Sequence, residues 1–250
     1  MTTFSGSALI TGGTSGIGRA TAELLHERGY RVAVTGRSPE SVAQAREELP
    51  ADVLVIRADA RRVSETADAI AEVGERFGHL TTLFINAGIT RAAALGTVDE
   101  ATWDEIHDTN TKGSYFTLQQ ALPLLTDGAS VIFTGGLGAT PPFGIAGGSA
   151  TAASRGALIA MVSSLALELA PRAIRVNAVS PGAIETPIWG KSAAPAEAVA
   201  ARKAAIAART PLGRFGTARE IAETVAFLAS DGAAYLTGQN IVVAGGGGLG

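Results

Sequence analysis

Short apolar segments rich in β-branched residues alternate along the chain with longer segments whose apolar residues recur at helical spacing. We predict strands over residues 8–10, 31–35, 53–57, 82–85, 130–134, 174–179 and 240–243. We predict helices over residues 19–28, 39–49, 64–77, 103–125, 149–169, 196–208 and 218–229. Strands that alternate with helices predict a parallel sheet covered on both faces. This is an α/β, doubly wound fold that binds its ligands at the carboxyl ends of the strands.

The alternation runs through a single domain, residues 1–250, without an evident linker or internal repeat. It is interrupted over about residues 187–211 by a long alanine-rich segment with a helical middle. Such an excursion at the carboxyl edge of a sheet predicts a substrate lid, with an ordinary surface helix as the alternative. The glycines at 245–248 predict a loose end of the chain.

Composition narrows the classes of partner. A net charge of −3 without a basic stripe argues against nucleic acid. The chain has no cysteine, and His26, His79 and His107 lie too far apart for a local metal motif, so we expect no metal. The first residues lack the regions of a secretory signal, and no apolar stretch reaches the roughly 18 residues of a membrane helix. We therefore expect a cytoplasmic protein with no membrane contact.

A glycine-rich turn follows the first predicted strand and opens the first predicted helix. Residues 11–18 read Thr-Gly-Gly-Thr-Ser-Gly-Ile-Gly. Glycines bring the backbone close to a pyrophosphate, and the free N–H groups of a helix N-terminus bind its charge. We therefore predict a dinucleotide site formed by Gly12, Thr14, Ser15, Gly16, Ile17 and Gly18.

The end of the second predicted strand indicates which dinucleotide is bound. An acidic residue about 20 residues after the turn would hold the ribose hydroxyls of NAD. This chain has Arg37 and Ser38 there instead, so no carboxylate repels a 2′-phosphate, and Arg37 supplies a permanent, fork-shaped cation. We predict a preference for NADP(H) over NAD(H). The alternative is that Arg37 is a solvated surface residue.

Further motifs extend the site along the chain. Asp59-Ala60 follows the third predicted strand, Asn86-Ala87-Gly88 follows the fourth, and Asn110 lies within a long helix. Residues 180–186, Ser-Pro-Gly-Ala-Ile-Glu-Thr, follow the sixth. With the glycine turn, the order and spacing of these motifs resemble the short-chain dehydrogenase/reductase family over essentially the whole chain.

The resemblance implies a Rossmann-like fold and a role for each motif. Asp59 and Ala60 would contact the adenine. The other cofactor-binding residues that it implies are Asn86, Ala87, Gly88, Pro181, Gly182, Ile184 and Thr186, of which Ile184 and Thr186 would hold the carboxamide. Members of the family are commonly dimers or tetramers, so the helices at 103–125 and 149–169 predict a homo-oligomer. The alternative is that their apolar residues face only the core.

The catalytic residues of the family are replaced in this chain. Members usually carry Tyr-x-x-x-Lys on the helix after the fifth strand, in which the lysine lowers the pKa of a proton-donating tyrosine. Thr151 stands at the tyrosine position and Arg155 at the lysine position. The usual serine is also missing, since residues 134–138 read Thr-Gly-Gly-Leu-Gly. Asn110 is the member of the usual set that this chain retains.

An aliphatic alcohol is a far poorer acid than tyrosine, so proton transfer needs another arrangement. The candidates are Ser149 or Thr151 polarised by Arg155, a water near Asn110, or an acidic group of the substrate. Arg155 could also bind the cofactor ribose.

Two functions fit these observations. The first is an NADP(H)-dependent oxidoreductase acting on a small, fairly apolar carbonyl or alcohol, with a non-standard proton transfer. The second is an NADP-binding protein without redox turnover, acting as a sensor or an inactive partner subunit. Halohydrin dehalogenases also resemble the family and carry an arginine at the lysine position. They keep the tyrosine and lose the glycine turn, however, and this chain does the reverse.

Overall fold

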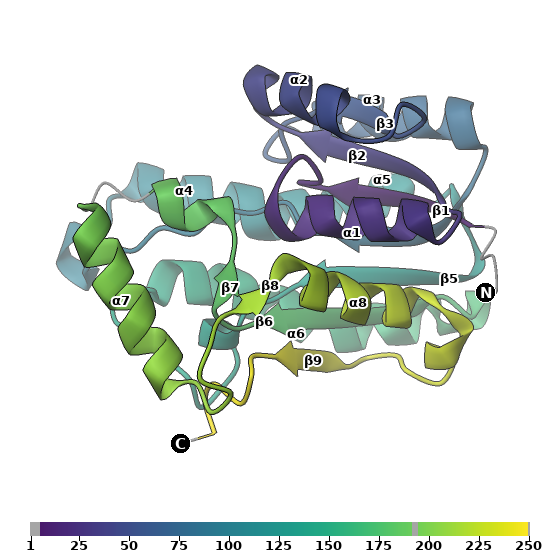
Figure 1. The fold of residues 1–250 in the computed structure, drawn as a ribbon. Coiled ribbons are helices and arrows are strands. Elements are labelled where there is room, and N and C mark those ends of the chain that lie inside the picture. Colours follow the sequence, from purple (N-terminus) through teal and green to yellow (C-terminus); the bar gives the residue numbers. More distant parts are fainter. Residues whose placement is uncertain (1–5, 192–194, 250) are drawn as a thin grey trace.

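The computed structural model describes residues 6–191 and 195–249, and over these ranges seven parallel strands form one sheet (Figure 1). The strands are β1 (Ser7–Thr11), β2 (Arg31–Gly36), β3 (Leu54–Arg57), β4 (Leu80–Ile85), β5 (Leu125–Thr134), β6 (Arg175–Pro181) and β9 (Asn240–Val243). Their order in the sheet is β3-β2-β1-β4-β5-β6-β9. The order reverses between β1 and β4, and doubly wound folds bind ligands at such a switch point. The predicted fold class is confirmed.

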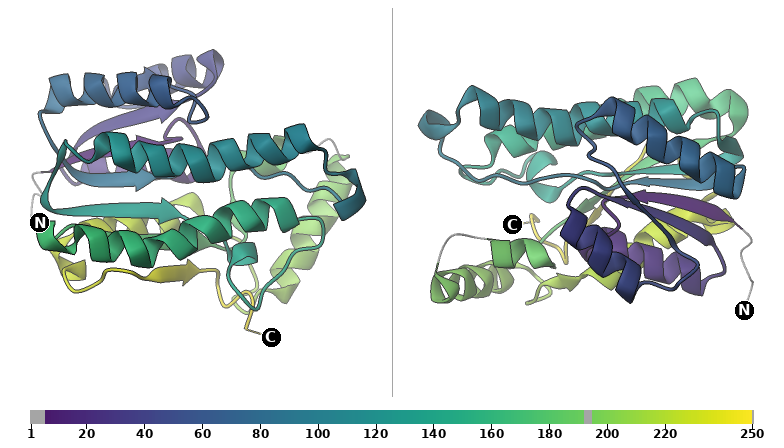
Figure 2. Two further views of the ribbon diagram at one scale, coloured as in Figure 1. Left: turned by 180° about the vertical axis from the view of Figure 1, so that it is seen from behind. Right: turned by 90° about the horizontal axis from the view of Figure 1, so that it is seen from above.

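Helices cover both faces of the sheet (Figure 2). The longer ones are α1 (Gly16–Glu27), α2 (Pro39–Glu48), α3 (Val63–Phe77), α4 (Glu100–His107), α5 (Gly113–Ala121), α6 (Ser149–Leu169), α7 (Ala196–Arg209) and α8 (Ala218–Ala229). The helices α1, α2 and α8 pack on one face, and α3, α5 and α6 pack on the other. The two-residue strands β7 (Ile184–Glu185) and β8 (Gly216–Thr217) pair beyond the carboxyl edge.

The strands bury their side chains on both faces, as expected of a sheet between two helical layers. Ile10 and Phe84 belong to the core beneath α1 and α8, whereas Leu9, Leu83 and Phe133 belong to the core beneath α5 and α6. All five are fully buried. This alternation fixes the register, because a slip by one residue would exchange the two cores.

The predicted helix at 103–125 is wrong in two details. After α4 the chain makes a π-helical turn at Asp108–Lys112, and the helix then ends at Ala121 rather than at residue 125. The strand β5 begins at Leu125, which pairs with Leu80 of β4, well before the predicted start at residue 130. Leucine favours helices, but here pairing between strands outweighs local propensity.

The glycine-rich end of the chain is packed, which corrects the expectation of a loose terminus. The Leu212 N–H donates to the Gly245 carbonyl at 3.1 Å. A Cβ at Gly246 would lie 2.9 Å from Pro211, and one at Gly248 would collide with the Phe143 ring. The absence of side chains therefore lets residues 245–248 lie against two loops.

The apolar length of α6 also corrects an expectation. Residues Ser149–Arg172 are long and apolar enough to cross a membrane by length and composition, although none of the chain's apolar stretches was expected to reach that length. In this fold Leu158 and Val162 of α6 are buried against the sheet. The helix therefore serves as one wall of a folded core.

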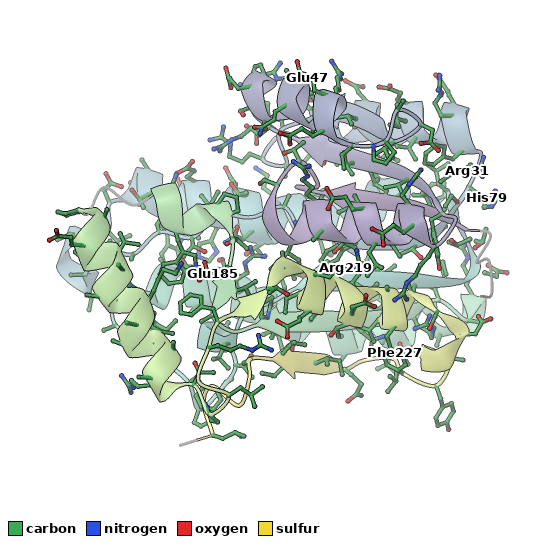
Figure 3. The ribbon with its side chains drawn as sticks, in the orientation of Figure 1. Arg31, Glu47, His79, Glu185, Arg219 and Phe227 are labelled. Atoms are coloured by element: carbon green, nitrogen blue, oxygen red, sulfur yellow. The ribbon has the colours of Figure 1, made fainter. Side chains whose placement is uncertain are left out.

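The predicted lid, 187–211, is described except for residues 192–194, which lie outside the described ranges. Its helix α7 projects beyond the carboxyl edge of the sheet and buries none of its described residues. Lys203 Nζ pairs with the carboxylate of Glu185 at 2.6 Å and lies over the Phe215 ring. Figure 3 labels Glu185. These contacts of Lys203 attach a largely exposed helix to β7 and to the residue before β8.

We expect Thr11→Val to lower the free energy of unfolding by about 1–3 kcal/mol. The buried Thr11 hydroxyl accepts hydrogen bonds from the Asn86 and Ala87 N–H groups, both at 3.0 Å, and valine would leave them without it. The neighbouring Thr35 is also buried, but its hydroxyl forms no hydrogen bond within the described ranges, so Thr35→Val is the matched control. Urea unfolding followed by circular dichroism measures both variants. Equal losses in the two variants would contradict this assignment.

Candidate cofactor-binding and active site

The turn between β1 and α1 depends on close backbone packing. Gly12 and Gly16 adopt positive φ angles of 64° and 55°. A Cβ at Gly18 would collide with the Gly12 carbonyl and would lie 2.6 Å from the Asn86 side-chain nitrogen. The Ser15 side chain forms no cap hydrogen bond, so it does not occupy the first N–H groups of α1. The turn therefore has the features of a phosphate-binding helix N-terminus.

The side chain of Asn86 holds this turn in place. Its Nδ2 donates to the Thr11 and Gly12 carbonyls, each at 3.2 Å, and its Oδ1 accepts from the Thr134 hydroxyl at 3.2 Å. One amide therefore connects the ends of β1, β4 and β5. The family resemblance implies that Asn86 lines the cofactor. In the structure its amide is a positioning group for the turn.

The remaining turn residues also pack against distant segments. The Thr14 side chain fills the space that a Cβ at Gly36 would need, and Ile17 packs on the core beneath α1. Ser38 caps α2, because its hydroxyl accepts from the Ser41 N–H at 3.1 Å. The Thr186 side chain lies beside Gly16, within 3.6 Å of a Cβ there. The loop after β6 thus reaches the glycine turn.

The rest of the 181–186 segment is held by backbone pairing. The Gly182 N–H donates to the Val243 carbonyl at 3.0 Å, and Pro181 pairs with Val243 in the sheet. Ile184 is buried in the core, and its carbonyl accepts from Trp189 Nε1 at 2.9 Å. Contact of Ile184 with a carboxamide stays a prediction.

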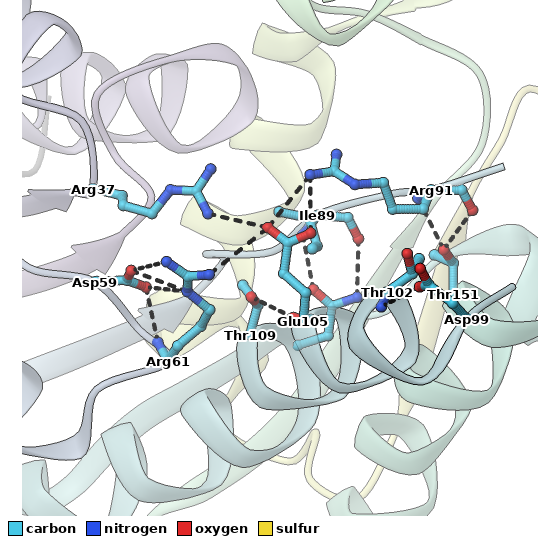
Figure 4. Close-up of polar contacts among 11 residues, drawn as sticks. Arg37, Asp59, Arg61, Ile89, Arg91, Asp99, Thr102, Glu105, Thr109 and Thr151 are labelled. Carbon is cyan, nitrogen blue, oxygen red and sulfur yellow. Dashed lines mark hydrogen bonds and ion pairs between the residues drawn. The ribbon is translucent and has the colours of Figure 1, made fainter.

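Three arginines surround one carboxylate at the carboxyl ends of β2, β3 and β4 (Figure 4). The carboxylate of Glu105 lies 3.6 Å from Arg37 Nη1, 3.8 Å from Arg61 Nη1 and 3.1 Å from Arg91 Nη2. We call these four residues the arginine cluster. Only Arg37 was predicted as a site residue. Arg61, Arg91 and Glu105 follow no recognisable spacing in the sequence, so no local signal could have grouped them.

Asp59 is engaged by Arg61 rather than free. Its carboxylate accepts from Arg61 Nε at 3.0 Å, from Nη2 at 2.6 Å and from the Arg61 backbone N–H at 3.1 Å. Burial opposes ionisation of Asp59, but these hydrogen bonds outweigh it and the pKa of Asp59 lies below its usual value. The neighbouring Ala60 carbonyl packs against Gly113. Contact of Asp59 and Ala60 with adenine stays a prediction.

Asn110 lies in the π-helical turn and is fully buried. Its Oδ1 accepts from the Ile89 N–H at 2.8 Å, and its Nδ2 donates to the Ile89 carbonyl and the Ser154 hydroxyl, both at 2.9 Å. Its amide therefore holds the loop after β4 onto α6. The sequence prediction missed Ser154, which appears there only as another helix residue.

The hydroxyl of Thr151 is occupied by backbone. It accepts from the Arg91 N–H at 3.2 Å and donates to the Arg91 carbonyl at 3.1 Å. A hydroxyl that uses its proton in this way is not presented to a substrate. Ser149 is exposed in the first turn of α6. The geometry therefore brings Thr151 to the loop after β4 and commits its hydroxyl to the Arg91 backbone.

Arg155 supplies a positive charge at the ends of β4 and β5. Its Nη1 donates to the Thr134 carbonyl at 2.7 Å, and its guanidinium fills the space beside Gly88. Among the described residues, no carboxylate pairs with it. Burial lowers the pKa of Arg155 to about 10, so it stays charged at neutral pH. A partly buried cation without a protein counter-charge is suited to an anionic or oxygen-rich ligand.

The chain is similar to known proteins over nearly its whole length. Residues 12–247 match the protein family described as enoyl-(acyl carrier protein) reductase. The 3-oxoacyl-[acyl-carrier-protein] reductase FabG of Staphylococcus aureus is 40% identical over 248 residues, which cover 96% of this chain and 97% of that protein. The protein of the same name from Thermotoga maritima is 38% identical over 244 residues, covering 95% and 96%.

A solved structure from Brucella melitensis is described as a short-chain dehydrogenase/reductase, glucose/ribitol dehydrogenase. It superposes with a TM-score of 0.88 at 33% identity, over 96% of this chain and 95% of that chain. The ligand-free aldohexose dehydrogenase of Thermoplasma acidophilum superposes with a TM-score of 0.87 at 27% identity, over 98% and 95%.

We expect Thr151→Val to increase hydrogen exchange in the loop around Arg91, because the variant loses both hydrogen bonds that hold the Arg91 backbone. Exchange measured by mass spectrometry on peptides covering residues 87–99 should accelerate several-fold. Ser149→Ala is the control on the same helix turn and should leave this loop unchanged. Unchanged protection in Thr151→Val would show that the hydroxyl does not hold the loop.

Proposed function

Because the chain belongs to the short-chain dehydrogenase/reductase family of oxidoreductases, we propose that it is an NADPH-dependent reductase of a small, fairly apolar carbonyl compound. The observation that carries the proposal is the position of Arg37 at the end of β2, next to the glycine turn. An arginine there matches a 2′-phosphate in charge and geometry. The similarity to 3-oxoacyl reductases supports a 3-oxoacyl thioester as the substrate class.

The bound cofactor would be held by the glycine turn, Arg37 and Arg155, and hydride is the chemistry that NADPH supplies when bound. Hydride addition to a carbonyl leaves negative charge on its oxygen. The Arg155 guanidinium can stabilise this charge or hold a ribose hydroxyl nearby. Because the Thr151 hydroxyl is bound to Arg91, we propose that the proton comes from water or from the substrate itself.

The second candidate is NADP(H) binding without turnover. The specific observation in its favour is that the Thr151 hydroxyl forms two hydrogen bonds with the Arg91 backbone, so it fastens a loop at the position of the usual acid. A complete cofactor cradle beside such a site suits a sensor or an inactive partner subunit.

We propose that the protein acts as a cytoplasmic homo-oligomer. Exposed apolar side chains on the helices predicted for assembly support this: Tyr115 on α5 is 42% exposed, and Leu167 on α6 is 79% exposed. Phe227 on α8, labelled in Figure 3, is 46% exposed. We also propose that α7 acts as the substrate lid, since it stands at the carboxyl edge and is anchored through Lys203.

We expect NADPH to bind at least tenfold more tightly than NADH, because only NADPH offers a phosphate to Arg37. Titration followed by nicotinamide fluorescence measures both. Arg37→Asp should abolish the preference, whereas Arg76→Asp, the same charge change at an exposed position of α3, should leave it intact. Equal affinity for both cofactors, or binding of neither, would overturn the proposal.

We expect turnover of NADPH with acetoacetyl-CoA, a 3-oxoacyl thioester, followed through the loss of nicotinamide absorbance. Arg155→Met should lower kcat by roughly 100-fold if the guanidinium stabilises the oxyanion. Thr151→Val should lower kcat by less than about tenfold, because loss of a general acid would cost roughly 100-fold or more. Tight NADPH binding without oxidation across a broad carbonyl panel would favour the second candidate.

A further inference from the structure

The arginine cluster joins three separate segments through the carboxylate of Glu105. Arg37 follows β2, Arg61 follows β3 and Arg91 lies on the loop after β4, whereas Glu105 projects from α4 (Figure 4). These segments end at the carboxyl edge of the sheet, where the proposed function requires the adenosine half of NADP(H) to lie. A carboxylate in this position would repel a phosphate, so Glu105 opposes the binding that the proposed function requires here.

The three guanidiniums differ in how closely they contact Glu105. Arg61 directs its hydrogen bonds to Asp59, and its Nη1 reaches Glu105 only at 3.8 Å. For Arg37, the 3.6 Å contact with Glu105 is the one ion pair found among the described residues. Arg91 donates a hydrogen bond to Glu105 at 3.1 Å. The carboxylate is thus bound most closely to Arg91 and neutralises Arg37 at longer range.

Arg91 is also the arginine of the cluster whose backbone is held in place by a side chain. Thr151 binds both its backbone N–H and its carbonyl, so the guanidinium starts from an anchored point of the loop. Arg37 is 48% exposed along its side chain and has freedom to turn. A phosphate that binds to Arg37 could therefore replace Glu105 as the partner of Arg37, while Glu105 stays paired with Arg91.

We propose that Glu105 is an internal competitor of the cofactor's 2′-phosphate and that Arg91 determines how strongly it competes. In the free protein, Glu105 neutralises Arg37 as well as pairing with Arg91. When a 2′-phosphate binds, Arg37 turns to it and Glu105 stays with Arg91. Glu105 therefore lowers the affinity for NADP(H) relative to NAD(H), and Arg91 limits that loss. This inference rests on the proposed function.

The charges of the arginine cluster and of Asp59 support the direction of the effect. Among these five residues, three guanidiniums face the carboxylates of Glu105 and Asp59, so the group by itself carries one excess positive charge. A phosphate that enters brings about two negative charges close to Glu105. The phosphate and the Glu105 carboxylate repel each other unless a cation pairs with the carboxylate, and Arg91 is placed to do so.

The test is a calorimetric titration with adenosine 2′,5′-bisphosphate and with adenosine 5′-monophosphate, which differ by the 2′-phosphate. Glu105→Gln should tighten binding of the bisphosphate by roughly fivefold, the size expected for one partly exposed charge pair. It should leave the monophosphate within about twofold. Asp104→Asn is the control and should change neither, because it makes the same charge change one residue away, at an exposed position that forms no ion pair with the residues that the structure describes.

A double-mutant cycle separates this role from general electrostatics. Arg91→Gln alone should weaken binding of the bisphosphate severalfold, because Glu105 then pairs only with Arg37 and Arg61. In the Glu105→Gln background, the same Arg91 change should have an effect of less than about twofold. If Arg91 acts only through its charge, it will weaken binding equally in both backgrounds, and the inference is wrong.

The outcomes also distinguish this inference from the function on which it rests. If the unaltered protein does not prefer the bisphosphate to the monophosphate, the NADP(H) proposal fails. If it does prefer the bisphosphate but Glu105→Gln leaves that preference unchanged, only the role of Glu105 fails. Thermal unfolding of each variant identifies any loss of fold.

Discussion

The approach of α1 to the end of β1 is the constraint on which the site depends. Gly18 must lack a side chain so that the helix can meet the Gly12 carbonyl, and the Asn86 amide occupies the remaining space. The same amide reaches the Thr134 hydroxyl at the end of β5. The geometry of the turn is therefore coupled to the relative positions of three strands, and a shift in any of them would also move the turn.

The loop after β4 is held by two side chains from the neighbouring helical segments. Thr151 and Asn110 both bind backbone of the loop after β4, one at Arg91 and the other at Ile89. Two side chains thus hold one loop at two points. A loop fixed in this way suits a site that keeps its ligands in register.

Much of the fold could be predicted from local pattern, because a buried parallel sheet leaves a run of β-branched residues wherever a strand lies. The glycine turn was equally readable, since its close packing excludes side chains. The early start of β5 at Leu125 could not be read, because it depends on pairing with Leu80, which lies far away in the sequence. The arginine cluster was hidden for the same reason. Glu105 lies far from Arg37 in the sequence, and neither residue carries a local signal of their contact.

The partly buried charge of Arg155 has a practical consequence for ligand discovery. A cation held at the ends of β4 and β5 without a carboxylate among the described residues costs the folded state some stability. Any small anion that reaches it will recover part of that cost and raise the melting temperature, whether or not it resembles a substrate. A thermal-shift screen of this protein will therefore rank compounds partly by charge. Neutral compounds deserve a separate ranking, with melting temperatures compared at matched ionic strength.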